Sequence, residues 1–167
     1  QGADAIECDV RMSADSVPVI IHDRNLKRTC GVNSNVDDLS IPEIKRLDAG
    51  RFKGPQWSGE RIPTLAEVLH DLPGNKRVWI EIKDNRAALQ AALDMIGTSG
   101  IEPERATILC FDIAIARAAA ASALSAYWLL EFQRHEHGDS EAPRVEEMIK
   151  AARAARLDGL ALHAGPG

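Results

Sequence analysis

The chain has 167 residues, and its 20 Lys and Arg against 25 Asp and Glu give a formal net charge of −5. With 45% hydrophobic and 27% charged residues, the composition is that of a globular domain and excludes a disordered chain. No apolar run reaches the ~18 residues of a membrane-spanning helix, and no basic stripe points to nucleic acid. Three cysteines cannot all pair, so we expect free thiols in a reducing compartment, the cytoplasm.

Two strands are expected at the start of the chain, over residues 4–10 and 17–21. Within the first, Glu7 and Asp9 share one face because side chains alternate along a strand. The connection between the two runs is too short for a parallel crossover, so they should form an antiparallel hairpin. A turn midway between them would place His22 roughly opposite Glu7.

The segment from about 24 to 62 has a different character, being rich in Asn, Asp, Gly and Pro and poor in aliphatic runs. Within it, Ser40 and Glu43 predict the start of a helix and Gly50 predicts its end. An excursion of about 40 residues is longer than a plain connection should be. A functional insertion and a surface decoration are both open interpretations.

Strands and helices then alternate with short joints, which predicts parallel βαβ units and an α/β fold. The expected strands are 78–83, 106–111, 126–131 and 159–163. The expected helices are 65–72, 86–96 (ended by Gly97), 113–121 and 145–156, with a polar loop over 132–141.

Polar side chains mark the ends of several expected strands, where a buried parallel strand should be apolar. Glu7 and Asp9 share a face of the first strand, Glu81 and Lys83 share a face of a later one, and His22 closes the hairpin arm. In a barrel of parallel strands, chemistry gathers at the carboxyl ends of the strands. We therefore expect these residues to form one site.

Three converging carboxylates, Glu7, Asp9 and Glu81, require a cation because burying unpaired negative charge costs several kcal/mol or more. Hard oxygen ligands favour Mg²⁺, Ca²⁺ or Mn²⁺ over zinc. Lys83 adds a second positive charge, and a metal beside a lysine suits a phosphate group. His22 is then the candidate general acid or base.

Each of these features has a simpler interpretation when it is taken alone. Glu7 and Asp9 would suit the wet face of an edge strand, and Glu81 with Lys83 would suit a surface ion pair. A single loop histidine such as His22 is usually solvated. The three features on successive strand elements together favour an active site.

Four ordered motifs resemble those of glycerophosphodiester phosphodiesterases. Residues 2–10 resemble the family's G-A-D-x-I-E-x-D-V strand, and residues 17–23 resemble its V-P-V-x-x-H-D segment. Residues 61–65 match its R-I-P-T-L joint, and residues 81–83 match its E-I-K strand. The resemblance is strong over residues 2–83 and weaker beyond them.

The resemblance implies a (β/α)₈ TIM barrel, present here in part as strands 2–6 in a single domain over 1–167, with the insertion after the hairpin arm. It implies metal-dependent hydrolysis of small-molecule glycerophosphodiesters to glycerol 3-phosphate and an alcohol by acid–base catalysis. The family's metal carboxylates correspond to Glu7, Asp9 and Glu81, which would bind Mg²⁺ or Ca²⁺. Its second catalytic histidine corresponds to His22, and its strand lysine to Lys83.

The family's H-R-G strand and two late strands have no counterpart in this sequence. We therefore expect an open arc that is incomplete at both ends, a piece of a longer polypeptide, and no activity from residues 1–167 alone. Two alternatives stay open: an inactive barrel that binds a phosphodiester or a partner protein, and a related phospholipase that releases a cyclic phosphate. The sequence predicts no oligomeric state.

Overall fold

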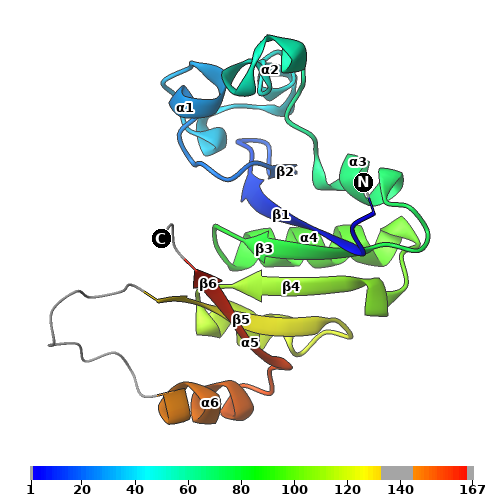
Figure 1. Cartoon of the computed structure of the whole chain (residues 1–167), viewed down its shortest axis with the longest axis vertical. Coiled ribbons are helices and arrows are strands. Elements are labelled where there is room, and N and C mark those ends of the chain that lie inside the picture. The colour runs from blue at the N-terminus through cyan, green and yellow to red at the C-terminus, as the bar shows by residue number, and fades with distance from the viewer. Residues whose placement is uncertain (1, 133–144, 165–167) are drawn as a thin grey trace, which may run out of the picture.

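The computed structural model describes residues 2–132 and 145–164, and the expected loop at 132–141 lies almost entirely outside them. A six-stranded sheet with the order β2-β1-β3-β4-β5-β6 forms the centre of the molecule (Figure 1). β1 and β2 pair antiparallel, as expected, and every other pair is parallel. The strands are β1 (Ala5–Met12), β2 (Pro18–Ile20), β3 (Arg77–Ile82), β4 (Ala106–Cys110), β5 (Ser125–Phe132) and β6 (Gly159–Ala164).

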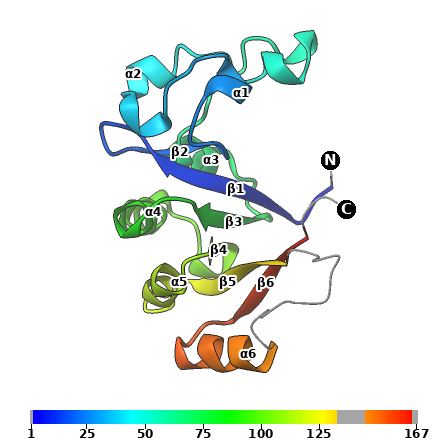
Figure 2. The same cartoon turned by 90° about the vertical axis from the view of Figure 1, so that its left-hand side faces the viewer.

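Helices connect the parallel strands in the predicted βαβ order. They are α3 (Leu65–Asp71), α4 (Arg86–Ser99), α5 (Ile113–Ala119) and α6 (Val145–Ala154). Figure 2 shows α4 and α5 on the same side of the sheet, and no helix of the described residues covers the opposite face. None of the helices in the described part of the chain has the length and apolar character needed to cross a membrane.

The helix boundaries follow from local capping chemistry. A capping box of Thr64 and Glu67 is present at the start of α3, and Asn85 caps α4 through the amides of the first turn. The predicted end of α4 at Gly97 is wrong. The helix continues to Ser99 and is capped by Gly100, whose φ of +78° is the left-handed conformation that glycine favours, while Gly97 costs the helix only about 1 kcal/mol.

The main core lies between the helices and one face of the sheet. Val10, Ile80 and Ile108 alternate with outward-facing neighbours along three strands and are fully buried. They pack in one cluster with Leu89 of α4 and Ile115 of α5. The alternate residues of the same strands, including Glu7, Asp9 and Glu81, therefore lie on the other face of the sheet.

The expected position of His22 opposite Glu7 is wrong by one residue. Val10 pairs with Ile20, and continuing this register brings His22 opposite Cys8. The reason is the turn, which is longer than expected: the amide of Ser13 donates to the carbonyl of Val17, and Ser16 adopts a left-handed φ of 61°.

The segment 24–62 folds into short helical turns over the carboxyl end of β1. These are α1 (Lys27–Cys30), η1 (Val36–Asp38), α2 (Ile41–Ile44), η2 (Arg51–Lys53) and η3 (Pro55–Trp57). A second small core of Leu26, Val36, Ile44 and Ile62 supports them together with Val19 and Ile21 of the hairpin arm.

The helix predicted between Ser40 and Gly50 begins as expected, with the capping box of Ser40 and Glu43, but it ends at Ile44. The Asp48 side chain accepts hydrogen bonds from the amides of Gly50 and Arg51. Such bonds compete with helix formation, so the chain turns away from the helix.

Candidate active site

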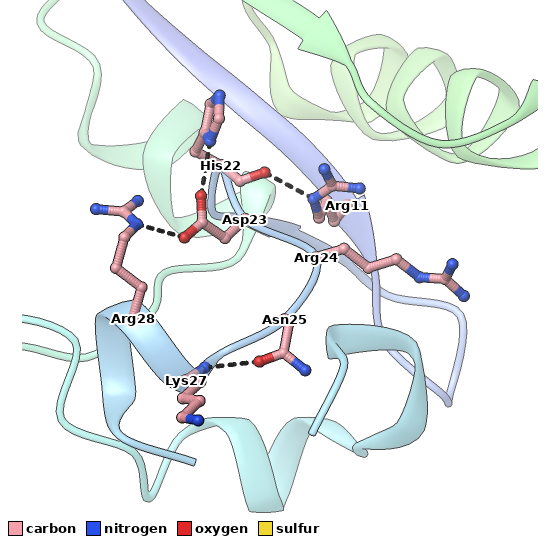
Figure 3. Close-up of a pocket in the computed structure, with 7 residues that line it drawn as sticks. All are labelled: Arg11, His22, Asp23, Arg24, Asn25, Lys27 and Arg28. Carbon is pink, nitrogen blue, oxygen red and sulfur yellow. Dashed lines mark hydrogen bonds and ion pairs between the residues drawn. The ribbon is translucent and has the colours of Figure 1, made fainter. Parts of the chain in front are cut away.

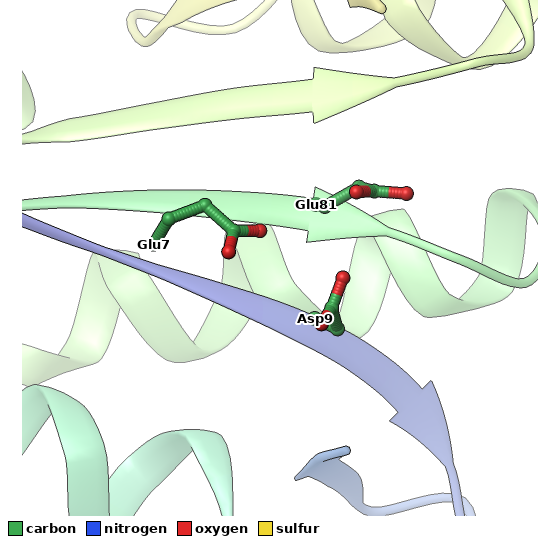
Figure 4. Close-up of side chains that lie close together, drawn as sticks. All are labelled: Glu7, Asp9 and Glu81. Carbon is green, nitrogen blue, oxygen red and sulfur yellow. The ribbon is translucent and has the colours of Figure 1, made fainter. Parts of the chain in front are cut away.

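Three carboxylates meet at the carboxyl ends of β1 and β3. The parallel register places Asp9 directly beside Glu81, and Glu7 lies two residues earlier on the same face of β1. One oxygen from each of the three side chains lies within 4.8 Å of the others. Figure 4 shows the Asp9 carboxylate turned from β1 toward Glu81 on β3. The expected convergence of these residues is therefore present.

Lys83 supplies positive charge to this cluster. Its Nζ lies 2.7 Å from Oε1 of Glu81 and 3.2 Å from Oδ1 of Asp9. Burial opposes the charged form, but the close contact with Glu81 and the charges of Glu81 and Asp9 outweigh it and raise the pKa of Lys83. Burial, followed by the negative charges of Asp9 and Glu81, raises the pKa of Glu7. One ammonium among three carboxylates leaves a formal excess of two negative charges.

The donor set fits a hard divalent cation. Among the described residues, Oε1 of Glu81 is the one buried side-chain oxygen or nitrogen without a well-formed hydrogen bond, despite its proximity to Lys83. All three donors are carboxylates, the ligands that Mg²⁺ and Ca²⁺ prefer. The nearby thiol of Cys8 offers no competing site, because burial and then the charges of Glu7 and Asp9 raise its pKa to about 12.

His22 follows β2 at the same end of the sheet. Its Nδ1 lies 2.8 Å from Oδ1 of Asp23, and the other carboxylate oxygen of Asp23 accepts a 2.5 Å hydrogen bond from Nε of Arg28. The hydrogen bond from Arg28, followed by that from His22, holds the pKa of Asp23 at about 2. The His22 side chain is 64% exposed, so its ring is oriented by Asp23 but open to a ligand.

A pocket lies beside His22 and is lined by the first residues of the insertion (Figure 3). Four of its seven lining residues are cationic. The lining residues are Arg11, His22, Asp23, Arg24, Asn25, Lys27 and Arg28.

Two residues that the sequence analysis did not select link His22 to β3. Arg11 donates from Nε to the carbonyl oxygen of His22 (2.8 Å) and from Nη1 to Oδ1 of Asp84 (2.7 Å). The other oxygen of Asp84 accepts a hydrogen bond from the backbone amide of Met12. The sequence does contain a pattern that selects Arg11, because residues 7, 9 and 11 of a strand share one face and Arg11 therefore lies on the same face as Glu7 and Asp9.

Phe111, the residue that follows β4, is a further neighbour of the cluster. Nζ of Lys83 lies 5.8 Å from the centre of its ring, a cation–π distance. The indole of Trp128 donates to the carbonyl oxygen of Phe111 (2.9 Å). The aromatic ring therefore forms one wall beside Lys83.

The sequence model of the glycerophosphoryl diester phosphodiesterase family matches residues 1–159. The chain belongs to this family. Among curated relatives, a glycerophosphodiester phosphodiesterase of Caldanaerobacter subterraneus is 45% identical over 82 residues, which are 49% of this chain and 33% of that protein. A human lysophospholipase D is 38% identical over 94 residues, 53% of this chain and 30% of that protein.

Solved structures of family members share the fold. An Oleispira antarctica phosphodiesterase in complex with sn-glycerol-3-phosphate gives a TM-score of 0.81 at 23% identity and covers 97% of this chain. A glycerophosphodiester phosphodiesterase of Thermotoga maritima gives a TM-score of 0.73 at 25% identity and covers 96%. The family resemblance and the α/β partial barrel expected from the sequence are confirmed.

The chain spans only part of these proteins. It covers 64% of the Oleispira chain and 61% of the Thermotoga chain, and the matched segment spans about a third of the curated relatives.

Proposed function

We propose that the protein hydrolyses glycerophosphodiesters to glycerol 3-phosphate and an alcohol with the aid of a divalent cation. The observation that supports this most strongly is the cluster of Glu7, Asp9 and Glu81, in which a single ammonium faces three carboxylates. Such a cluster binds a cation rather than an anion, and a cation beside Lys83 is suited to a phosphate group.

Glu7, Asp9 and Glu81 would hold the ion, which we propose to be Mg²⁺ or Ca²⁺. When bound, such an ion supplies positive charge that offsets the negative charge of the phosphodiester oxygens. Lys83 lies 2.7 Å from Glu81 and is placed to bind a phosphate oxygen at the rim of the cluster. The charged form that its raised pKa favours is the form that binds phosphate.

His22 is proposed as the general acid or base. Its Nδ1 is engaged by Asp23, so Nε2 is the nitrogen that exchanges a proton with the substrate or with water. In hydrolysis the bond between phosphorus and the alcohol oxygen breaks. That oxygen gains a proton, and phosphorus gains the oxygen of water. The ion pair of Asp23 with Arg28 keeps Asp23 ionised and the imidazole oriented.

The substrate is proposed to be a small glycerophosphodiester. The pocket beside His22 has a volume of about 690 Å³, within the roughly 300–1,000 Å³ of small-molecule sites, and offers room for the alcohol part. The relatives named as a glycerophosphodiester phosphodiesterase and a lysophospholipase D support this substrate class. The three free cysteines support a reducing compartment, and we propose the cytoplasm.

The test uses the full-length protein and a panel of glycerophosphodiesters that differ in the alcohol. We expect release of glycerol 3-phosphate, loss of the release in excess EDTA, and recovery when Mg²⁺ or Ca²⁺ is restored. Product analysis by ³¹P NMR separates this reaction from release of a cyclic phosphate. Turnover that persists in EDTA would contradict the proposal, and so would binding of the diesters without turnover.

A further inference from the structure

The insertion carries a closed loop at residues 49–60, here called the aromatic loop. The amide of Ala49 donates to the carbonyl oxygen of Glu60 (2.8 Å) and joins the two ends of the loop. Asp48 accepts four hydrogen bonds from within or beside it: from the amides of Gly50, Arg51 and Gly59 and from the hydroxyl of Ser58.

Glycine at position 50 is required by the close approach of the two sides of the loop. A Cβ at Gly50 would lie 1.9 Å from the carbonyl oxygen of Trp57. The loop is therefore a fixed conformation with its own hydrogen bonds and tight packing, which is the character of an Ω-loop.

This fixed loop holds two large aromatic side chains in solvent. Phe52 is 43% exposed and Trp57 is 51% exposed. Two exposed cations, Arg51 and Lys53, lie on the same short turn as Phe52, and neither forms an ion pair with any residue in the described part of the chain. Aromatic rings beside free cations are the side chains that settle at the boundary between lipid headgroups and acyl chains.

The charge of the insertion supports a negatively charged surface as the partner. Residues 24–62 contain eight Lys and Arg and five Asp and Glu, whereas the rest of the chain contains twelve and twenty. A chain with a net charge of −5 is repelled by an anionic surface as a whole. Residues 24–62 carry an excess of three positive charges, eight minus five, so the uneven charge distribution of the chain orients the insertion toward such a surface.

The shape favours a bilayer over a protein partner. The segment that follows α2, which carries the aromatic loop, projects from the top of the molecule in Figure 2. A stable protein interface needs about 800 Å² of complementary surface on each side, whereas two aromatic rings on a projecting loop offer little area to a folded partner. A fluid lipid surface closes around such a projection without a complementary shape.

The loop is also linked by contacts to the candidate active site. Cζ of Arg28 lies 5.4 Å from the centre of the Phe52 ring. Arg28 forms a hydrogen bond with Asp23, and Asp23 forms one with His22. A surface that holds Phe52 and Trp57 would therefore lie on the side of the molecule from which His22 is reached.

We propose that the aromatic loop docks the protein on an anionic lipid surface, with Phe52 and Trp57 inserted among the headgroups and with Arg51 and Lys53 paired to lipid phosphates or carboxylates. This contact is peripheral and goes beyond the proposed hydrolysis. Its test measures binding alone, so an inactive enzyme would not affect the result.

The test is co-sedimentation of the full-length protein with vesicles of phosphatidylcholine and phosphatidylserine (70:30) and with vesicles of phosphatidylcholine alone. We expect binding to the mixed vesicles, weaker binding to the neutral ones, and loss of binding at high salt. The double variant Phe52→Ala/Trp57→Ala should bind at least tenfold more weakly. Arg51→Glu/Lys53→Glu should lower the affinity for the mixed vesicles about fivefold or more for each charge that is reversed.

Two matched controls on α6 change the same properties elsewhere. Val145→Ala/Ile149→Ala removes two exposed apolar side chains, and Lys150→Glu/Arg153→Glu reverses two exposed cations. Both should bind like the wild type, with circular dichroism confirming that every variant is folded. The proposal is overturned if the wild type does not bind, if the loop variants bind as well as the wild type, or if the α6 variants lose as much binding.

Discussion

His22 is the residue on which the proposed acid–base chemistry depends. Replacing it by Ala removes the ring nitrogen that transfers the proton, so kcat should fall by ~10²- to 10⁴-fold. Cation affinity should change little, because the oxygen donors are on Glu7, Asp9 and Glu81. The measurements are steady-state kinetics and calorimetry on the full-length protein, with His70→Ala as the control at an exposed histidine. Near-normal turnover in His22→Ala would remove this residue from the mechanism.

Arg11 is expected to position His22 rather than to contact the substrate. Arg11→Lys cannot bond both the His22 carbonyl and Asp84, so the His22 segment should shift relative to β3. A displacement of about 1 Å lowers kcat by up to ~10²-fold, and we expect a loss of that order in kcat with a smaller change in KM.

The control for Arg11 is Arg105→Lys, because Arg105 likewise donates two side-chain hydrogen bonds, to the carbonyl oxygens of Lys76 and Pro73, and does not line the pocket beside His22. A purely structural role for Arg11 predicts lower thermal stability with kcat unchanged in the folded enzyme, and that result would contradict a positioning role.

Asp23 makes stability depend on acid pH. Hydrogen bonds from Arg28 and His22 hold the pKa of Asp23 at about 2, below the ~3.9 of an unfolded aspartate. The unfolded chain therefore binds the proton more tightly, and this contribution to stability is present above about pH 4 and is lost as the pH falls through 2. In urea unfolding at pH 2–5, Asp23→Asn should show a shallower loss of stability than the wild type. Parallel curves for the two proteins would show that Asp23 does not carry the effect.

Among the elements, the aromatic loop is held in its closed conformation by the side chain of Asp48, which lies just outside it. Asp48→Ala removes four hydrogen bonds, so the loop should open locally while the sheet stays folded. Trypsin should then cleave after Arg51 or Lys53 at least several times faster than in the wild type. Asp71→Ala, at the exposed end of α3, is the control. Equal cleavage rates in the wild type and Asp48→Ala would mean that Asp48 does not hold the loop closed.

The strands and most helices were predictable from the sequence because their signals are local. Alternation placed Glu7 and Asp9 on one face of β1, and the parallel register of neighbouring strands brought Glu81 beside them. The capping box of Thr64 and Glu67 fixed the start of α3 from two residues three positions apart.

Features that depend on irregular turns, or on contacts between residues far apart in the sequence, were not predictable. The hairpin register differs by one residue because Ser16 is left-handed, a conformation that the sequence does not announce in a non-glycine residue. Arg11 and Asp84 are 73 positions apart, so their ion pair follows from the fold rather than from spacing. The early end of α2 depends on hydrogen bonds that Asp48 makes across the aromatic loop.

On the scale of the whole molecule, the two faces of the sheet have separate roles. One face is buried beneath the helices and supplies the core, while the other holds the carboxylates, Lys83 and a stacked pair of Trp79 and Tyr127 with ring centres 6.5 Å apart. The insertion adds a positively charged region above the carboxyl end of β1. This division allows the core to stabilise the fold without constraining the side chains of the candidate site.

The central claim is that Glu7, Asp9 and Glu81 bind one divalent cation, and calorimetric titration of the full-length protein with Mg²⁺ and Ca²⁺ tests it most directly. We predict one ion per chain for at least one of the two metals. Glu81→Gln should weaken its affinity at least tenfold, whereas Glu104→Gln, at an exposed carboxylate elsewhere, should bind like the wild type. Absence of binding in the wild type, or equal affinity in Glu81→Gln, would contradict the account.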